Sequence, residues 1–190
     1  MPDSYSYIAE MGIILTIYIF IVILVTKFST DRYILGVSTL FGVMAAILEI
    51  VHISIENFGH LNGHAEAVST GIFMITLFLI FGVSGFYIAI RTKKISSGVW
   101  GGSWSAVVCM LLVMTYGLSQ LFWSFAAIEK HNIGNPDFIR TGWTDMHAFV
   151  IADIFEACFK VLFLGPIIGI IFGLFGAAIA QFFVRKNLNR

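Results

Sequence analysis

The sequence predicts an all-α integral membrane protein with five transmembrane helices, its N-terminus outside and its C-terminus in the cytoplasm. Two observations on composition predict this class: 58% of the 190 residues are hydrophobic and only 12% are charged, whereas about a quarter are charged in soluble domains. A third is the length of the apolar runs, because a membrane-crossing helix needs roughly 20 mostly apolar residues. We expect residues 1–190 to form a single transmembrane domain.

The same composition excludes several classes of protein. A soluble globular domain would be less apolar, and a disulfide-stapled secreted module would need more than the two cysteines present. The 11 basic residues are balanced by 11 acidic ones, so the chain lacks the positive surface that nucleic acid requires. The expected partner is the lipid bilayer of the cell membrane, and no nucleic acid.

Five apolar runs follow one another along the chain. The first four each have the length of one crossing: Tyr7–Phe28, Tyr33–Phe58, Glu66–Ile90 and Ser103–Ile128. The fifth, Trp143–Val184, would measure about 63 Å as one straight helix, twice the hydrocarbon thickness. We therefore expect an outer surface segment, Trp143–Lys160, and a last crossing, Val161–Val184, with the helix broken near Gly165-Pro166.

Lysine and arginine predict the orientation, because the cytoplasmic ends of spans carry an excess of both. Eight of the eleven lie after the first run, after the third run and at the C-terminus: Lys27, Arg32, Arg91, Lys93, Lys94, Arg185, Lys186 and Arg190. Alternating crossings place these three segments inside and the N-terminus outside. An odd number of crossings follows, and we predict five.

The histidines and acidic residues gather on the opposite side. All five histidines and ten of the eleven acidic residues fall outside or in the outer half of the membrane: His52, His60, His64, His131, His147, Asp3, Glu10, Glu49, Glu56, Glu66, Glu129, Asp137, Asp145, Asp153 and Glu156. Ionisable groups at membrane depth are costly and usually functional. The sequence therefore predicts a histidine and carboxylate site in the outer half of the membrane.

Two polar stripes share a spacing of i, i+3 and i+7, which places all members of each on one helical face. They are Glu49, His52 and Glu56 on the second run, and Asp153, Glu156 and Lys160 on the last. If the stripes face each other, Lys160 is expected to neutralise one of the carboxylates.

The favoured hypothesis is a metal- or haem-binding subunit of a membrane-bound redox enzyme complex. Glu49-x-x-His52 has the spacing that di-iron helical bundles use, and mixed imidazole and carboxylate ligands suit iron, copper or zinc without choosing among them. The predicted metal ligands are Glu49, His52, Glu56, His147, Asp153 and Glu156. Haem b held by His64 and His147 is an alternative cofactor.

A second hypothesis is a small proton- or ion-coupled transporter, since buried acids and histidines with one lysine form such pathways. The inner halves of the spans hold almost no ionisable groups. A pathway to the cytoplasm would therefore use hydroxyl groups such as those of Ser38, Thr39, Thr76 and Ser84.

A third hypothesis is a metal-free acid–base enzyme that modifies lipids. His52-x-x-x-Glu56 on the second run, Glu66 at the start of the third and Tyr116-Gly117 on the fourth resemble the arrangement in the sterol-isomerase (emopamil-binding) family. The resemblance implies that a histidine and two glutamates stabilise a carbocation in an aromatic-lined cavity. The long loop that this family has before its third span is absent from the sequence.

The last hypothesis is a structural accessory subunit. A strip of small residues on the last run would let helices of other membrane subunits, or of a second copy, pack closely: Gly165, Gly169, Gly173 and Gly176. The chain also contains a weak hairpin repeat, residues 33–91 and 103–184, which would place His64 and His147 at related positions.

Overall fold

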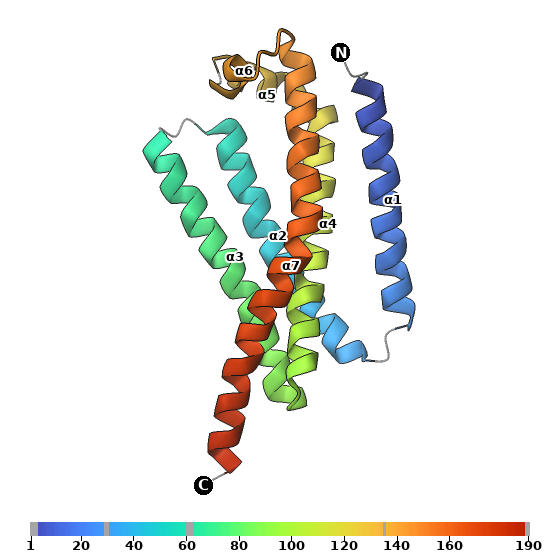
Figure 1. Ribbon diagram of the computed structural model, residues 1–190, viewed down its shortest axis with the longest axis vertical. Coiled ribbons are helices and arrows are strands. Elements are labelled where there is room, and N and C mark those ends of the chain that lie inside the picture. The colour runs from blue at the N-terminus through green and yellow to red at the C-terminus, as the bar shows by residue number, and fades with distance from the viewer. Residues whose placement is uncertain (1–3, 29–30, 60–62, 135, 189–190) are drawn as a thin grey trace.

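Figure 1 shows a computed structural model, which describes residues 4–28, 31–59, 63–134 and 136–188. These residues form seven helices, and none of the residues described lies in a strand. The helices are α1 (Ser4–Phe28), α2 (Arg32–Phe58), α3 (Gly63–Thr92), α4 (Ile95–Trp123), α5 (Phe125–His131), α6 (Pro136–Arg140) and α7 (Met146–Leu188). The predicted all-helical class is confirmed. Asp3 and His60 lie outside the described residues.

Four helices are long and apolar enough to cross a membrane. They are α2, α3, α4 and the part of α7 from Met146 to Val184. Helix α1 has 25 residues, and its apolar stretch, Gly12–Lys27, is shorter than those of the other four. These four long apolar helices are compatible with an integral membrane protein.

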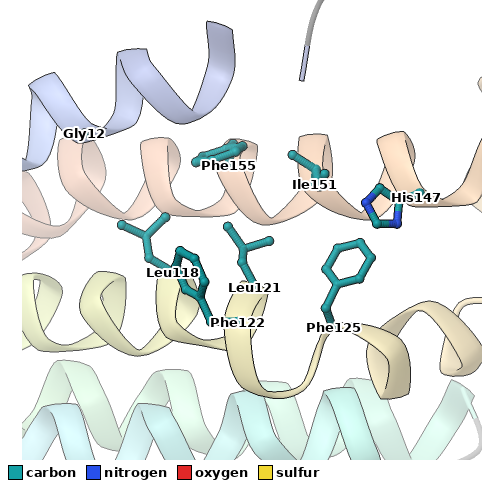
Figure 2. A pocket seen from close by; sticks show the side chains of 8 residues that line it. All are labelled: Gly12, Leu118, Leu121, Phe122, Phe125, His147, Ile151 and Phe155. Atoms are coloured by element: carbon teal, nitrogen blue, oxygen red, sulfur yellow. The ribbon is translucent and has the colours of Figure 1, made fainter. Parts of the chain in front are cut away.

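Helices α4 and α7 pack along each other at the centre of the bundle (Figure 1). Helix α3 and the end of α2 lie on one side of this pair, α1 stands on the other, where it contacts mainly α7, and α2 begins on the α1 side and crosses behind the pair (Figure 1). A cavity of about 380 Å³ lies beside α1 and is lined by residues of α4, α5 and α7, among them Leu118, Phe125 and Phe155 (Figure 2). Helix α1 is therefore the least tightly packed of the long helices.

Different elements lie at the two ends of the bundle. The start of α1, the start of α7, α5 and α6 lie at one end, and the turn between α3 and α4 and the end of α7 lie at the other (Figure 1). We call these the outer and inner ends, after the orientation that the sequence predicts.

The connection predicted between the third and fourth spans, Arg91–Gly102, is wrong. Helix α3 continues to Thr92 and α4 begins at Ile95, so only two residues separate them. A glycine in this segment is a packing position: a Cβ atom on Gly98 would lie 2.5 Å from the carbonyl oxygen of Gly85 on α3. Because Gly98 has no side chain, the backbones of α3 and α4 can pack closely at this point.

The last apolar run is one continuous helix of 43 residues, with Pro166 inside it. The predicted division into Trp143–Lys160 and Val161–Val184 is therefore not observed. Figure 1 shows α7 changing direction near its middle instead. Proline removes one backbone hydrogen bond and kinks a helix, and the contacts that α7 makes with α3 and α4 hold both halves in place.

The glycine strip of α7 is used within this chain. A Cβ atom on Gly102 of α4 would lie 2.5 Å from Cα of Gly173 on α7. A Cβ atom on Gly85 of α3 would lie 2.5 Å from the carbonyl oxygen of Gly173. Gly169 also faces α4, where an added Cβ would lie 2.8 Å from the carbonyl oxygen of Gly102. We call this contact between α3, α4 and α7 the glycine interface.

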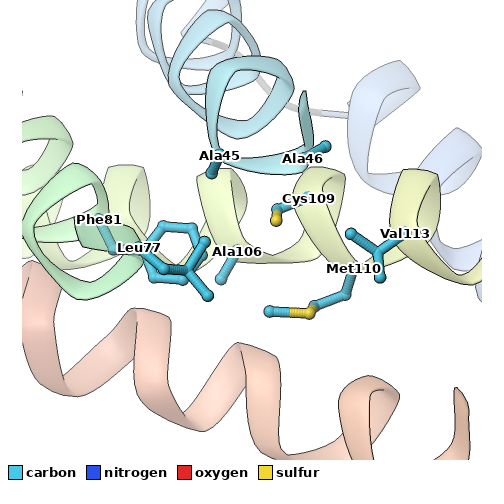
Figure 3. Close-up of a cluster of buried hydrophobic side chains, with 8 residues drawn as sticks. All are labelled: Ala45, Ala46, Leu77, Phe81, Ala106, Cys109, Met110 and Val113. Atoms are coloured by element: carbon cyan, nitrogen blue, oxygen red, sulfur yellow. The ribbon is translucent and has the colours of Figure 1, made fainter. Parts of the chain in front are cut away.

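Apolar side chains, many of them small, fill the core between α2, α3 and α4 around the fully buried Phe81 (Figure 3): Ala45, Ala46, Leu77, Phe81, Ala106, Cys109, Met110 and Val113. Further toward the inner end, the fully buried hydroxyl groups of Ser84 and Ser105 lie 2.8 Å apart, and Ser105 is 2.9 Å from the carbonyl oxygen of Ser38. Together with the glycine interface, these contacts pack the inner half of the bundle tightly.

Candidate functional site

A buried histidine lies between two carboxylates on α2. Nδ1 of His52 is 3.5 Å from Oε1 of Glu49, and Nε2 is 3.0 Å from Oε1 of Glu56. His52 is 2% exposed and Glu49 is 8% exposed. Successive residues at i, i+3 and i+7 face the same way on a helix, and the structure places all three on one side of α2, as the spacing predicts.

Helix α3 holds the imidazole of His52 from the other side. Phe73 stacks on the ring, with 4.7 Å between centroids. The Thr70 hydroxyl lies 2.9 Å from Oε1 of Glu56 and 3.4 Å from Nε2 of His52. A packed aromatic face and a fixed carboxylate leave the imidazole little freedom to rotate, which is the geometry that proton transfer in a defined direction requires.

Two polar atoms of this group have no hydrogen-bond partner among the described residues. They are Oε2 of Glu49 and Nδ1 of His52, and both are buried. Buried polar atoms are nearly always hydrogen-bonded, and those that are not call for a ligand, water or ion as an explanation. The side of His52 that faces Glu49 therefore has capacity to bind one more polar group.

Two cavities of about 200 Å³ each lie along α7, and α2 and α4 contribute to the lining of both. Helix α3 forms a further wall of the inner cavity, with Met74, Leu77 and Phe78. The outer cavity is lined by Glu56 and Asn57 of α2, Gln120 of α4 and Asp153 of α7, and the inner one by Glu49 of α2 and Lys160 of α7. Val161 of α7 borders both. We call the two cavities together the α2–α7 trough. Glu49 and Glu56 of one stripe and Lys160 and Asp153 of the other thus line the trough. His52 lies behind its two carboxylates and lines neither cavity, and Glu156 lines a separate cavity beside α1.

An amide pair closes the outer end of the trough. Nδ2 of Asn57 donates to Oε1 of Gln120 at 3.0 Å. Gln120 is 3% exposed, and its Nε2 has no hydrogen-bond partner among the described residues. A polar side chain buried in an apolar helix is costly unless it is paired, so the free amide nitrogen needs an explanation.

Lys160 pairs with its own helix. Its Nζ lies 2.6 Å from Oε1 of Glu156, and both side chains are more than half exposed, at 62% and 64%. The expectation that Lys160 neutralises a carboxylate of the other stripe is therefore not met by a direct ion pair. Lys160 and Glu49 nevertheless line the same inner cavity.

The two predicted haem ligands lie on different sides of the bundle. His147, in the first turn of α7, lines the cavity beside α1, where its ring centroid is 4.3 Å from that of Phe125 (Figure 2). Its Nδ1 is 3.9 Å from Oε2 of Glu129. His64 is exposed in the first turn of α3, and α3 and α1 flank the α4–α7 pair on opposite sides (Figure 1). The structure does not bring His64 and His147 together.

The six predicted metal ligands divide in the same way. Glu49, His52 and Glu56 lie together on α2, Asp153 and Glu156 lie on α7, and His147 faces α1. Within residues 4–28, 31–59, 63–134 and 136–188, no group of three or more His, Cys, Asp and Glu side chains is arranged to hold a metal ion.

Four residues of the site were not predicted. Thr70 and Phe73 come from α3, and their contacts with His52 depend on how α3 packs against α2. Asn57 and Gln120 carried a signal in the sequence, since each is an uncharged polar residue near the outer end of an apolar helix. Their pairing across α2 and α4 could not be deduced without the fold.

No family model matches this chain, and no curated protein and no solved structure matches it either. The fold and the site define an all-helical protein whose four long apolar helices are compatible with a membrane, with carboxylates lining a trough beside a buried histidine.

Proposed function

We propose that the α2–α7 trough is the acid–base site of a metal-free enzyme that acts on an apolar, lipid-like molecule. The contact of His52 with both Glu49 and Glu56 carries the proposal. An imidazole between two carboxylates can hold a proton, give it up and be recharged, as general acid–base catalysis requires. The trough beside it supplies space for a substrate.

The lining of the trough favours an apolar substrate. Apart from a few polar groups, the side chains are aliphatic or sulfur-containing, such as Met110, Met114, Val161 and Leu164. Pockets of this kind bind molecules that are mainly apolar and use a few polar groups to orient them. The cavity of the inner half, about 250 Å³ between α3 and α7, is lined by apolar side chains and glycine alone, and this favours an enzyme over a transporter.

A double-bond isomerisation is the reaction that fits these groups without a further reactant. A proton passes to one carbon of a C=C bond from the carboxyl group of Glu56, which lines the outer cavity and is recharged by the His52 imidazolium 3.0 Å away. The carbocation then loses a proton from a neighbouring carbon to a carboxylate. The double bond moves, and nothing is oxidised or reduced. Glu49 and Glu56 would stabilise the positive charge as it forms. The resemblance of His52-x-x-x-Glu56 to the sterol-isomerase pattern supports the same chemistry.

Deuterium exchange tests this proposal. Wild-type protein in vesicles containing an unsaturated sterol or polyprenoid, placed in D₂O, is expected to raise the mass of the recovered lipid by mass spectrometry. Thr115→Val serves as a control variant, because this exposed hydroxyl group bonds only to its own helix, at the carbonyl of Leu111. Lipid that gains no deuterium above a protein-free vesicle would refute the enzyme proposal.

We further propose that the chain crosses the membrane five times with its N-terminus outside, so that the trough opens toward the outer leaflet. Cysteines introduced at Ile133, which is 73% exposed near α5, and at Ser96 on the first turn of α4 test this. An impermeant thiol reagent is expected to label I133C in intact cells and S96C only after permeabilisation. Cys109 and Cys158 are buried and free, so the background is low. The reverse labelling pattern would invert the orientation.

A metal site is the second candidate, and the two unpartnered atoms on Glu49 and His52 favour it. One imidazole nitrogen and one carboxylate oxygen could serve as ligands for iron, copper or zinc. Elemental mass spectrometry of the purified protein is expected to find one metal per chain in this case, and less in His52→Ala and Glu49→Gln. An absorption spectrum of the same sample would identify haem.

A further inference from the structure

The outer end of the trough contains a hydrogen-bond donor with no acceptor. Gln120 is buried on α4 and lines the outer cavity. Its Oε1 already accepts from Asn57, and its Nε2 has no partner among the described residues. Leaving a buried donor unpaired costs more than an ordinary hydrogen bond contributes, so a ligand that supplies an acceptor there would gain affinity.

The same cavity also offers acceptors. Glu56 and Asp153 both line it, from α2 and α7. A ligand oxygen in this cavity therefore meets one donor and two carboxylates. A hydroxyl group satisfies both kinds of neighbour, because it accepts one hydrogen bond and donates another. An ether or a carbonyl oxygen can only accept, and a hydrocarbon does neither.

The position of Gln120 agrees with an amphiphilic ligand. Asn57 and Gln120 lie close to the ends of α2 and α4, which finish at Phe58 and Trp123. Deeper in the trough the lining is apolar except for Glu49 and Lys160, with Val161 and Leu164 among the apolar residues. A molecule with one hydroxyl group at the outer end and an apolar body below it would match this order.

From these observations we propose that Gln120 recognises the hydroxyl group of an apolar alcohol, which it orients in the trough with the apolar body toward the inner cavity beside Glu49. The alcohol's oxygen accepts from Nε2 of Gln120, and its O–H donates to a carboxylate of the outer cavity. This inference rests on one part of the proposed function, namely that the trough holds an apolar substrate. It adds the class of that substrate and a residue that determines specificity.

Ligand binding, rather than activity, tests the inference. Farnesol, its methyl ether and the hydrocarbon farnesene differ in this one oxygen, and their binding to the purified full-length protein can be measured by competition in detergent micelles. Wild type is expected to bind farnesol about tenfold more tightly than the ether or the hydrocarbon, which is the effect of leaving one buried polar group unpaired.

Two variants of Gln120 and one neighbour complete the experiment. Gln120→Met keeps the length of the side chain and Gln120→Glu keeps an acceptor for Asn57, and both remove the donor. Both are expected to lose the preference for farnesol while still binding farnesene. Ser119→Ala, whose hydroxyl bonds to the carbonyl of Tyr116, is expected to keep the preference.

The outcomes separate this inference from the proposed function. Equal binding of the three compounds to wild type, or an unchanged preference in both Gln120 variants, overturns the inference even if deuterium exchange is observed. A preference that depends on Gln120 supports it even if no exchange occurs, in which case the trough binds an alcohol without acting as an acid–base enzyme.

Discussion

Replacing His52 by glutamine is expected to lower the rate of deuterium exchange about 10²- to 10⁴-fold, the range that general acid–base groups contribute. Glutamine keeps polar atoms near Glu49 and Glu56 but cannot be protonated at neutral pH. The measurement is the initial rate of deuterium incorporation into lipid in reconstituted vesicles, at equal amounts of folded protein.

Two further variants make this result specific. Glu56→Gln removes a charge 3.0 Å from Nε2 of His52 and is expected to lower the rate as well. Thr115→Val removes an exposed hydroxyl group remote from the trough and is expected to leave the rate unchanged. If His52→Gln exchanges at the wild-type rate while folded, His52 does not transfer the proton.

The second large effect is on stability. Gly102→Ala is expected to lower the free energy of unfolding by about 1–3 kcal/mol, the usual cost of inserting a group into a filled core. The new Cβ atom would lie 2.5 Å from Cα of Gly173 and 2.8 Å from the carbonyl oxygen of Gly169. Both contacts are with backbone, so α4 and α7 must move apart.

Gly71→Ala is the matched control on α3. It also adds one methyl group to a glycine within a long helix, but nothing lies within 4 Å of the new atom. Alanine favours the helix over glycine by up to about 1 kcal/mol, so this variant is expected to be as stable as wild type or slightly more so. Thermal unfolding followed by size-exclusion chromatography in detergent compares the two. Equal melting temperatures for G102A and G71A would contradict the close packing of the glycine interface.

Features that depend on one helix could be predicted from the sequence. The shared face of Glu49, His52 and Glu56 follows from helical geometry alone, and the structure places the three residues together. The pairing of Lys160 with Glu156 is local too, since residues four apart are neighbours on a helix. The two stripes together predict that Lys160 reaches across to the other helix, and the structure shows the local pair within α7 instead.

Features that depend on how helices pack could not be predicted in this way. Gly98 lies between the third and fourth apolar runs of the sequence, yet in the structure it is a contact point of α4 with α3. Pro166 predicts a break in the helix, yet α7 is continuous around it and packs against α3 and α4. Whether His64 and His147 meet depends on which side of the α4–α7 pair each one occupies. Residue spacing contains no information about that choice.

The most direct test of the central claim measures deuterium exchange by wild-type protein before and after treatment with excess metal chelator. A metal-free acid–base site at His52 predicts the same exchange rate in both samples, with no metal remaining by elemental analysis. Exchange that disappears on chelation and returns when a single metal is added back would contradict the claim, and would make the metal site at Glu49 and His52 the better account.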